Sequence, residues 1–236
     1  MAAAFPTQTS SLLSVTVSVN IMKKLLLFVV IALATGISVF AQNESGLGIN
    51  AGAGIIMAKQ KGSTTMMGTT TNSTTSGPGF YVNFGFNDDL GLGGLGYTMD
   101  LFFDHWALSD DAGTSDAVAR ENYIGFAMAI NISLDASETL SLQPFFGPGF
   151  SWGLSSKTDW TNPITNQKET LDNYDEDTHY LRQYSYLTVG ADILLKSLHL
   201  RLRGSVDFGM WDRYSSVKEI TTKDGPNLRL GVAYLF

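Results

Sequence analysis

The last nine residues of the chain alternate between apolar and other side chains. The apolar positions are Leu228, Leu230, Val232, Tyr234 and Phe236, so the alternation runs to the final residue. A period of two indicates a β-strand with one buried face, whereas a free terminus in water normally frays. This strand therefore needs paired neighbours and an apolar medium against one face. A closed sheet in a lipid bilayer provides both, because closure leaves no edge and lipid covers the outside.

A second informative segment lies near the start of the sequence. Met22-Lys23-Lys24 precedes an apolar run over 25–34, and Val39-Phe40-Ala41 follows it. Two lysines, a short apolar core and a small residue before the cut are typical of a secretory signal peptide. The rival interpretation is a membrane-spanning helix, but the run is short for one.

These features divide the chain into three parts. We expect a signal peptide over 22–41, cleaved between Ala41 and Gln42, and a β-barrel domain over 42–236. Residues 1–21 carry no charge, and we interpret them as a mis-assigned upstream start or an unstructured extension.

Composition excludes several classes of function. The sequence contains no cysteine, which excludes disulfides and thiol chemistry. Loss of Lys23 and Lys24 with the signal leaves 13 basic and 22 acidic side chains, a formal net charge of −9. Such an acidic chain repels phosphates, so we expect no nucleic-acid partner.

Period-two alternation divides the predicted domain into about eight strands. They span residues 46–58, 79–86, 90–103, 122–132, 139–154, 181–195, 198–211 and 228–236. The apolar face changes phase at Gly93-Gly94, which we interpret as a β-bulge. Pro144 and Pro148 cannot donate to the ladder, so the strand that contains them is predicted to be irregular there.

The predicted connections alternate in length. Three are short, at 87–89, 133–138 and 196–197, and four are long and polar, at 59–78, 104–121, 155–180 and 212–227. Short turns at one end and long loops at the other fit an up-and-down barrel. The Ser/Thr-rich stretch 63–76 has no periodicity, and we expect it to be mobile.

The small residues on the non-apolar face indicate which face is inside. A soluble barrel buries its apolar face, and a membrane barrel exposes it. Small residues suit the narrow lumen of eight strands, and the glycines assigned to it are Gly48, Gly52, Gly54, Gly85, Gly125, Gly147, Gly149, Gly190, Gly204 and Gly231. Aromatic residues near the strand ends fit two interfacial girdles: Phe86, Tyr234 and Phe236 at one end, and Phe103, Trp106, Trp152 and Trp211 at the other.

Charged residues of both signs share the predicted inner face. If Lys196-Ser197 is a two-residue turn, Asp192 lies opposite Arg201. We therefore predict a lumenal ion pair between these two side chains. Arg203, Asp207 and Arg229 are predicted to belong to the same network. Tyr81, Phe145, Tyr184 and Tyr186 are also predicted to point inward, where they would help to fill a barrel of this size.

These features, together with Phe146-Gly147-Pro148-Gly149-Phe150, resemble the small bacterial outer-membrane β-barrel ("porin") family, OmpA-like and OmpX-like in size. The resemblance implies an all-β, closed, antiparallel up-and-down transmembrane barrel with both termini in the periplasm. It also implies that the alternate residues ending at Phe236 are read by the barrel-assembly machinery. The expected partners are the lipid bilayer, lipopolysaccharide, that machinery and periplasmic chaperones, with the chain a monomer.

No arrangement of residues points to catalysis, a metal or a cofactor. A lipid A deacylase would need Ser and His adjacent on the lipid-facing surface with an acid behind them, and no predicted strand carries a His-x-Ser pair. We interpret His105 and His179 as solvated residues at loop bases, and place His199 inside. The acidic stretch 172–177 lacks the spacing and the glycine of a calcium loop, and a weak cation bridge from it to lipopolysaccharide phosphates stays open as an alternative.

We therefore expect a protein that is not an enzyme, with no wide pore and a structural, adhesive or loop-presenting role. Two alternatives stay open. One is a lipid-modifying enzyme of the lipid A deacylase or acyltransferase type, and the other is a narrow channel.

Overall fold

The computed structural model describes residues 48–110, 116–162, 164–175, 180–210 and 220–236. The predicted upstream extension, signal peptide and cleavage site between Ala41 and Gln42 lie outside these ranges, as do Trp211 and His179. Within the ranges, no helix has the length and apolar character needed to cross a membrane.

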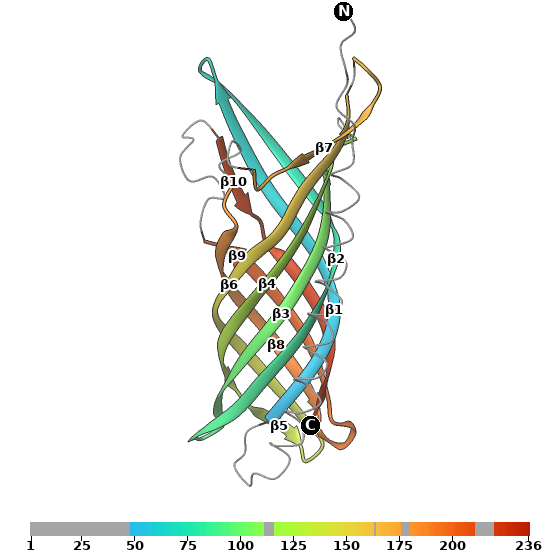
Figure 1. Ribbon diagram of the computed structural model, residues 1–236. Helices are drawn as coiled ribbons and strands as arrows, with labels where there is room; N and C mark the ends of the chain where they lie inside the picture. Colours follow the sequence, from blue (N-terminus) through green and yellow to red (C-terminus); the bar gives the residue numbers. More distant parts are fainter. Residues whose placement is uncertain (1–47, 111–115, 163, 176–179, 211–219) are drawn as a thin grey trace, which may run out of the picture. The chain divides into compact units, whose positions relative to one another are not determined.

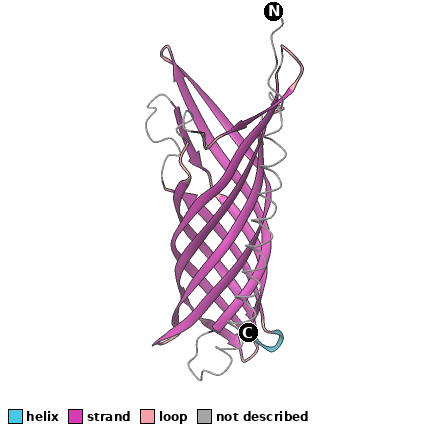
Figure 2. Cartoon of the chain, viewed as in Figure 1, coloured by secondary structure: helices cyan, strands magenta, loops and turns pink. Residues whose placement is uncertain are grey.

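Eight antiparallel strands form a closed ring, seen from the side in Figures 1 and 2. They are β1 (Gly48–Met66), β2 (Thr69–Leu92), β3 (Leu95–Asp110), β4 (Val118–Ile132), β6 (Leu140–Thr161), β8 (Gln183–Leu195), β9 (Leu200–Gly209) and β11 (Asn227–Leu235). The ring runs β1-β11-β9-β8-β6-β4-β3-β2 and closes by pairing β2 with β1. The predicted closed up-and-down barrel of about eight strands is confirmed.

Three short strands extend the ring. β5 (Leu134–Ser137) and β7 (Lys168–Asp172) pair with β6, and β10 (Ile220–Asp224) pairs with β1. β7 and β10 lie at the end of the barrel where the strands project furthest, as Figure 1 shows. The β2–β3, β5–β6 and β8–β9 turns and the C-terminus lie at the opposite end, which we call the tight-turn end.

The last strand closes the barrel against the first. β11 pairs with β1 from Asn50–Leu235 to Met57–Leu228, and the Phe236 amide donates to the Ile49 carbonyl at 2.9 Å. The backbone is therefore paired up to the final residue, so the C-terminal strand has no free edge.

Large apolar side chains cover the outside of the barrel. On β11 the five alternate residues from Leu228 to Phe236 are 42–52% exposed, whereas Arg229 and Ala233 between them are 6% and 5% exposed. The same alternation holds on the other strands, with Ile55, Phe80, Leu101, Phe126, Phe146, Val189 and Phe208 among the exposed residues. The predicted outward orientation of the apolar face is therefore observed on every strand of the ring.

The turn between β2 and β3 does not lie where the sequence predicts it. Gly93-Gly94, interpreted as a bulge, is the turn between β2 and β3, with φ of 62° and 87°. The predicted turn at 87–89 instead lies inside β2. The phase change is real, since the register shifts between Asp89 and Leu92, next to the turn. Two successive glycines accept the positive φ values that a tight hairpin requires.

The stretch 63–76 is ordered strand rather than a mobile loop. β1 and β2 pair without interruption out to Met66–Thr69, and Met67 (φ 49°) and Gly68 (φ 78°) make the turn. Threonine and serine rows on both strands supply β-branched and small polar side chains that suit a two-sided hairpin in water. Such a hairpin shows no apolar alternation, because neither of its faces belongs to the apolar wall of the barrel.

The turn between β8 and β9 has four residues instead of two. Lys196–Leu198 form a 3₁₀ turn, and His199 follows with φ of 53°. This longer turn moves the register by two residues, so that Asp192 lies opposite Arg203. A shift of two keeps every side chain on its predicted face, because the strand period is two.

Three further sequence predictions concern the regularity of β6 and the positions of Trp106 and Gly204. The β4–β6 ladder lacks the two rungs between Ala127–Gly149 and Ile130–Phe146, beside Pro148, but its register does not change there. β6 pairs with β8 in one register through Pro144 and Pro148, so the predicted irregularity is limited to those missing rungs. Trp106, predicted at the outer girdle, is instead buried inside. Gly204, predicted inside, shares the outer face with Leu202 and Val206, because Arg203 and Ser205 on either side of it face the lumen.

Candidate functional site: the lumen

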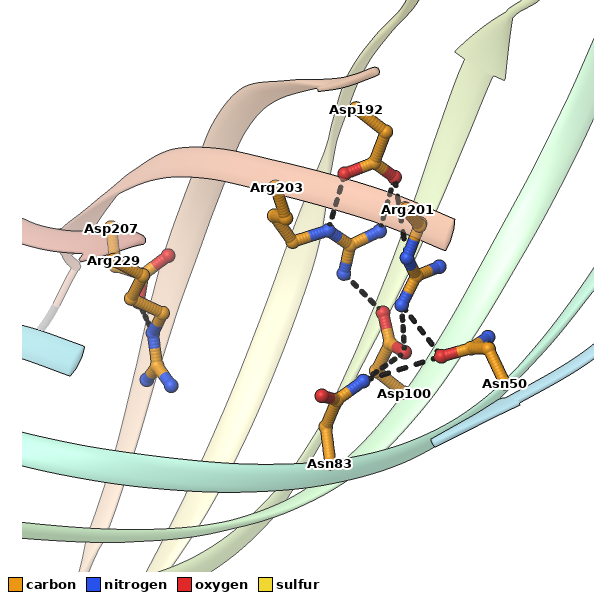
Figure 3. Close-up of polar contacts among 8 residues, drawn as sticks. All are labelled: Asn50, Asn83, Asp100, Asp192, Arg201, Arg203, Asp207 and Arg229. Atoms are coloured by element: carbon orange, nitrogen blue, oxygen red, sulfur yellow. Dashed lines mark hydrogen bonds and ion pairs between the residues drawn. The ribbon is translucent and has the colours of Figure 1, made fainter. Parts of the chain in front are cut away.

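The lumen near the tight-turn end holds a compact network of charged and amide side chains (Figure 3). Arg203 on β9 donates from Nε and Nη2 to the two oxygens of Asp192 on β8, each at 2.7 Å, and also pairs with Asp100 on β3. Arg201 donates to Asn50 at 2.6 Å and to Asp100 at 3.3 Å. Two arginines thus meet two aspartates in a buried setting, where charges need such partners.

The network departs in detail from the sequence prediction. The predicted pair is present but long, with 3.9 Å between Arg201 Nε and Asp192 Oδ2. Arg203 is the closer partner and binds the Asp192 carboxylate in a bidentate manner. Asp100 joins both arginines and was missed. Its signal was present, because Thr98 and Asp100 alternate with the apolar Tyr97, Met99 and Leu101.

A second charged group lies further along the lumen. Arg229 donates to both oxygens of Asp104, at 2.8 and 2.7 Å, and also to Asp207. Its guanidinium lies 5.0–6.0 Å from three ring centroids, those of Tyr81, Phe102 and Tyr186. Three aromatic rings and two carboxylates therefore surround this cation. Arg229 and Asp207 are among the predicted lumenal residues, and Asp104 is not.

The third group surrounds Glu121 at the end with the projecting strands. This buried carboxylate accepts hydrogen bonds from Trp106 Nε1 at 3.1 Å, Ser156 Oγ at 3.0 Å and Tyr180 OH at 3.0 Å. Tyr123 donates to it as well. Trp106 belongs here because its indole N–H needs a buried acceptor, which a lipid-facing position would not supply.

Aromatic rings fill most of the remaining lumen. Four of them lie over a glycine of a neighbouring strand, so that a Cβ there would overlap the ring: Tyr81 over Gly54 and Gly231, Phe102 over Gly125, Tyr186 over Gly149, and Phe145 over Gly190. Glycine on the inner face therefore makes room for the ring. The cavity left between the first two charged groups is about 40 Å³, enough for a few water molecules at about 10–15 Å³ each.

A row of three hydrogen-bonded polar side chains crosses the outer surface of β3, β4 and β6. His105 Nδ1 lies 2.9 Å from Asn122 Oδ1, and Asn122 Nδ2 donates to Ser155 Oγ at 2.7 Å. In a Ser-His-Asp type triad the histidine stands between the hydroxyl and the orienting group. Here the amide stands in the middle, so His105 is not the hydrogen-bond partner of Ser155.

The remaining candidate residues lie apart from one another. His199 was predicted inside, but it lies on the exposed β8–β9 turn with its ring 6.0 Å from that of Tyr234. In the part of the chain that the structure describes, no three His, Asp or Glu side chains are grouped as metal ligands would be. The stretch 172–177 is described only as far as Asp175.

Comparisons with known proteins give distant structural similarities. No protein-family model matches the chain, and no curated protein matches it. Solved structures that resemble it include the attachment invasion locus protein Ail of Yersinia pestis (13% identity, 79% of this chain and 99% of that chain, TM-score 0.34). Others are the outer membrane protein OprG of Pseudomonas aeruginosa (11%, 81% and 96%, 0.41) and the outer membrane protease OmpT of Escherichia coli (12%, 80% and 97%, 0.35). With TM-scores below 0.5, these similarities carry no conclusion about function.

Proposed function

We propose that this chain is an integral outer-membrane β-barrel that presents its projecting strands and loops to the exterior, in a structural or adhesive role. One observation carries the proposal: the barrel has an apolar outside and a charged, hydrogen-bonded inside. A ring of exposed Leu, Ile, Val, Phe and Met side chains on all eight strands is far larger than the apolar patches of soluble proteins. Lipid is the medium that satisfies such a surface.

The direct test is membrane insertion. The protein is expressed with its native sequence, and outer and inner membranes are separated. We expect it in the outer-membrane fraction, resistant to carbonate extraction, and migrating faster on a gel before heating than after. Recovery in the soluble fraction would contradict the proposal.

The filled lumen supports a role other than that of a pore. The three charged or polar groups and the aromatic rings fill the lumen around a cavity of about 40 Å³. Barrels with a water-filled channel have about sixteen strands, twice as many as this ring. We expect no stepwise conductance when the purified protein is added to planar bilayers. Regular single-channel steps would favour the narrow-channel alternative.

The order of the His105, Asn122 and Ser155 side chains supports a non-enzymatic role over the lipid-modifying alternative. A hydrolase needs the serine hydroxyl within reach of the histidine, and here the amide of Asn122 separates the two. We expect no release of fatty acid from lipid A by the purified protein. Release that is abolished by His105→Ala would support the enzyme.

The orientation belongs to the same proposal. The β2–β3, β5–β6 and β8–β9 turns and the C-terminus share one end of the barrel, and the hairpins at the other end project much further. Outer-membrane barrels place their short connections in the periplasm and their long ones outside. We therefore propose periplasmic termini, with the β1–β2 and β6–β7 hairpins outside the cell. Assembly would require the barrel-assembly machinery and periplasmic chaperones, with the C-terminal residues read as its signal. The OmpA-like resemblance stays part of this proposal.

A further inference from the structure

Three lysines gather on the outside of β1 and β10, directly beyond the apolar belt. The exposed residues Ile55 and Met57 alternate along β1 into Lys59 and Lys61. In the register, Lys61 lies opposite Lys223 of β10. Their neighbours Gln60 and Asp224 point inward, where Gln60 donates to Asp224 at 3.0 Å. The three lysines therefore face away from the lumen.

The pairing of Lys61 with Lys223 is unusual for a sheet. Directly opposite residues on antiparallel strands have Cβ atoms about 4.5–5.5 Å apart, and like charges there destabilise the pair. In the described ranges, no carboxylate forms an ion pair with Lys59, Lys61 or Lys223. The facing residues of β2 are the uncharged Ser76 and Thr74. Nothing described on these strands neutralises the cluster, so an external anion would relieve its repulsion.

The distance of the three lysines from the apolar belt indicates which anion they would bind. Met57 lies opposite Leu228 and Pro78 at the last apolar rung, and strands rise about 3.3 Å per residue. Lys59 and Lys61 therefore begin about 7 and 13 Å along β1 from Met57. This is the level of lipid headgroups when the belt lies in hydrocarbon. At the opposite rim, by contrast, Lys196 is already paired with Asp135 at 2.7 Å.

We propose that Lys59, Lys61 and Lys223 form a binding site for the phosphate groups of lipid headgroups in the outer leaflet. This inference rests on the proposed membrane insertion, which supplies the lipid. The stem of Lys59 lies against Gly225, and a long lysine stem along an apolar surface lets the ammonium group extend to the phosphates. The site would tie one seam of the barrel, where β10 joins β1, to the lipid around it.

The test uses protein purified from membranes and reconstituted into neutral phosphatidylcholine nanodiscs. Fluorescent bisphosphorylated lipid A and its dephosphorylated counterpart are titrated against the native chain. They are also titrated against the variant Lys59→Gln/Lys61→Gln/Lys223→Gln and against Lys168→Gln, a control that removes an exposed lysine on β7. We expect the native chain to prefer the phosphorylated lipid. The triple variant should bind it about fivefold more weakly per lysine removed, and the control should bind like the native chain.

The outcomes are distinguishable. Equal affinity of the native chain and the triple variant for phosphorylated lipid A overturns the inference. Equal affinity of the native chain for phosphorylated and dephosphorylated lipid A overturns it as well, since phosphate would then not be recognised. An Arg substitution at all three positions should restore binding. Failure of the native chain to enter nanodiscs, with no heat-modifiable migration, would instead contradict the proposed membrane insertion.

Discussion

Single residues decide how the lumen is filled. Gly149 lies under the buried ring of Tyr186, so a Cβ at this position would overlap that ring. We predict that Gly149→Ala destabilises the barrel by about 1–3 kcal/mol, the usual range for overpacking. The matched control is Gly204→Ala, where a Cβ would meet only Leu230 Cδ2 at 3.6 Å. Urea unfolding in lipid vesicles measures both, and equal stability of the two variants would contradict this view of the lumen.

We expect substitution of Arg229 to destabilise the barrel more than the glycine substitution does. Its replacement by Met leaves Asp104 and Asp207 buried without their cation, which we expect to destabilise the barrel by about 3–5 kcal/mol. Neutralising both acids in the same chain, with Asp104→Asn and Asp207→Asn, should recover most of that loss. The same urea titration compares the single and triple variants. A triple variant less stable than the single one would show that Arg229 acts by packing rather than by charge.

The residues missed in the lumen share a physical cause. Asp104 and Glu121 lie at the level where strands leave the apolar belt, and outside lipid both faces of a strand carry polar side chains. The alternation that reveals a strand disappears there, so both acids were assigned to a loop. The inward positions of Tyr81, Phe145, Tyr184 and Tyr186 were predictable, because their strands run through the belt.

At the scale of elements, turn chemistry decides what alternation leaves open. A hydrophobic pattern fixes which face a residue occupies, but a register shifted by two residues satisfies it equally well. The prediction that Asp192 lies opposite Arg201 depends on an assumed turn length, and the 3₁₀ turn at Lys196–Leu198 places Arg203 opposite Asp192. The predicted ion pair with Arg201 is still present, at 3.9 Å. Belt strands were predictable, and their polar extensions were not.

The β1–β2 hairpin is predicted to depend on its turn residues. Met67 adopts a positive φ, which is unfavourable for a side chain of its type. Met67→Asn should stabilise the hairpin, since Asn tolerates this conformation, and Gly68→Val should fray it. Amide hydrogen exchange over residues 59–76 measures the effect, with slower exchange expected for the first variant and faster for the second. Unchanged exchange in both would mean that the turn does not hold this hairpin.

The tight-turn end carries a pH-dependent contact. Lys196 donates to Asp135 at 2.7 Å, and this hydrogen bond lowers the pKa of the Asp135 carboxyl. A lowered folded-state pKa means that the contact contributes stability above the unfolded pKa and loses it as pH falls through the folded one. Carbon NMR of the Asp135 carboxyl in micelles should show a pKa below that of the Lys196→Gln variant. Equal values would mean that the pair does not form in solution.

At the scale of the whole molecule, the closed ring of strands and the separation of apolar and charged side chains onto its two faces depend on each other. The ring leaves no unpaired edge within the belt, and its outward side chains are those that lipid accepts. The lumen then holds charges that are shielded from the outer surface of the barrel, and they pair with one another. Two features of the sequence, the period-two pattern and the small residues opposite it, were enough to predict this architecture.

The absence of cysteine in the chain allows a direct test of that polarity. Single cysteines placed in turn at positions 228–234 of β11 are spin-labelled in vesicles, and collision rates with oxygen and with a water-soluble nickel complex are measured. We predict high oxygen and low nickel accessibility at 228, 230, 232 and 234, and low accessibility to both at 229, 231 and 233. Nickel accessibility at the even positions, or oxygen accessibility at the odd ones, would contradict a lipid-facing apolar wall around a filled lumen.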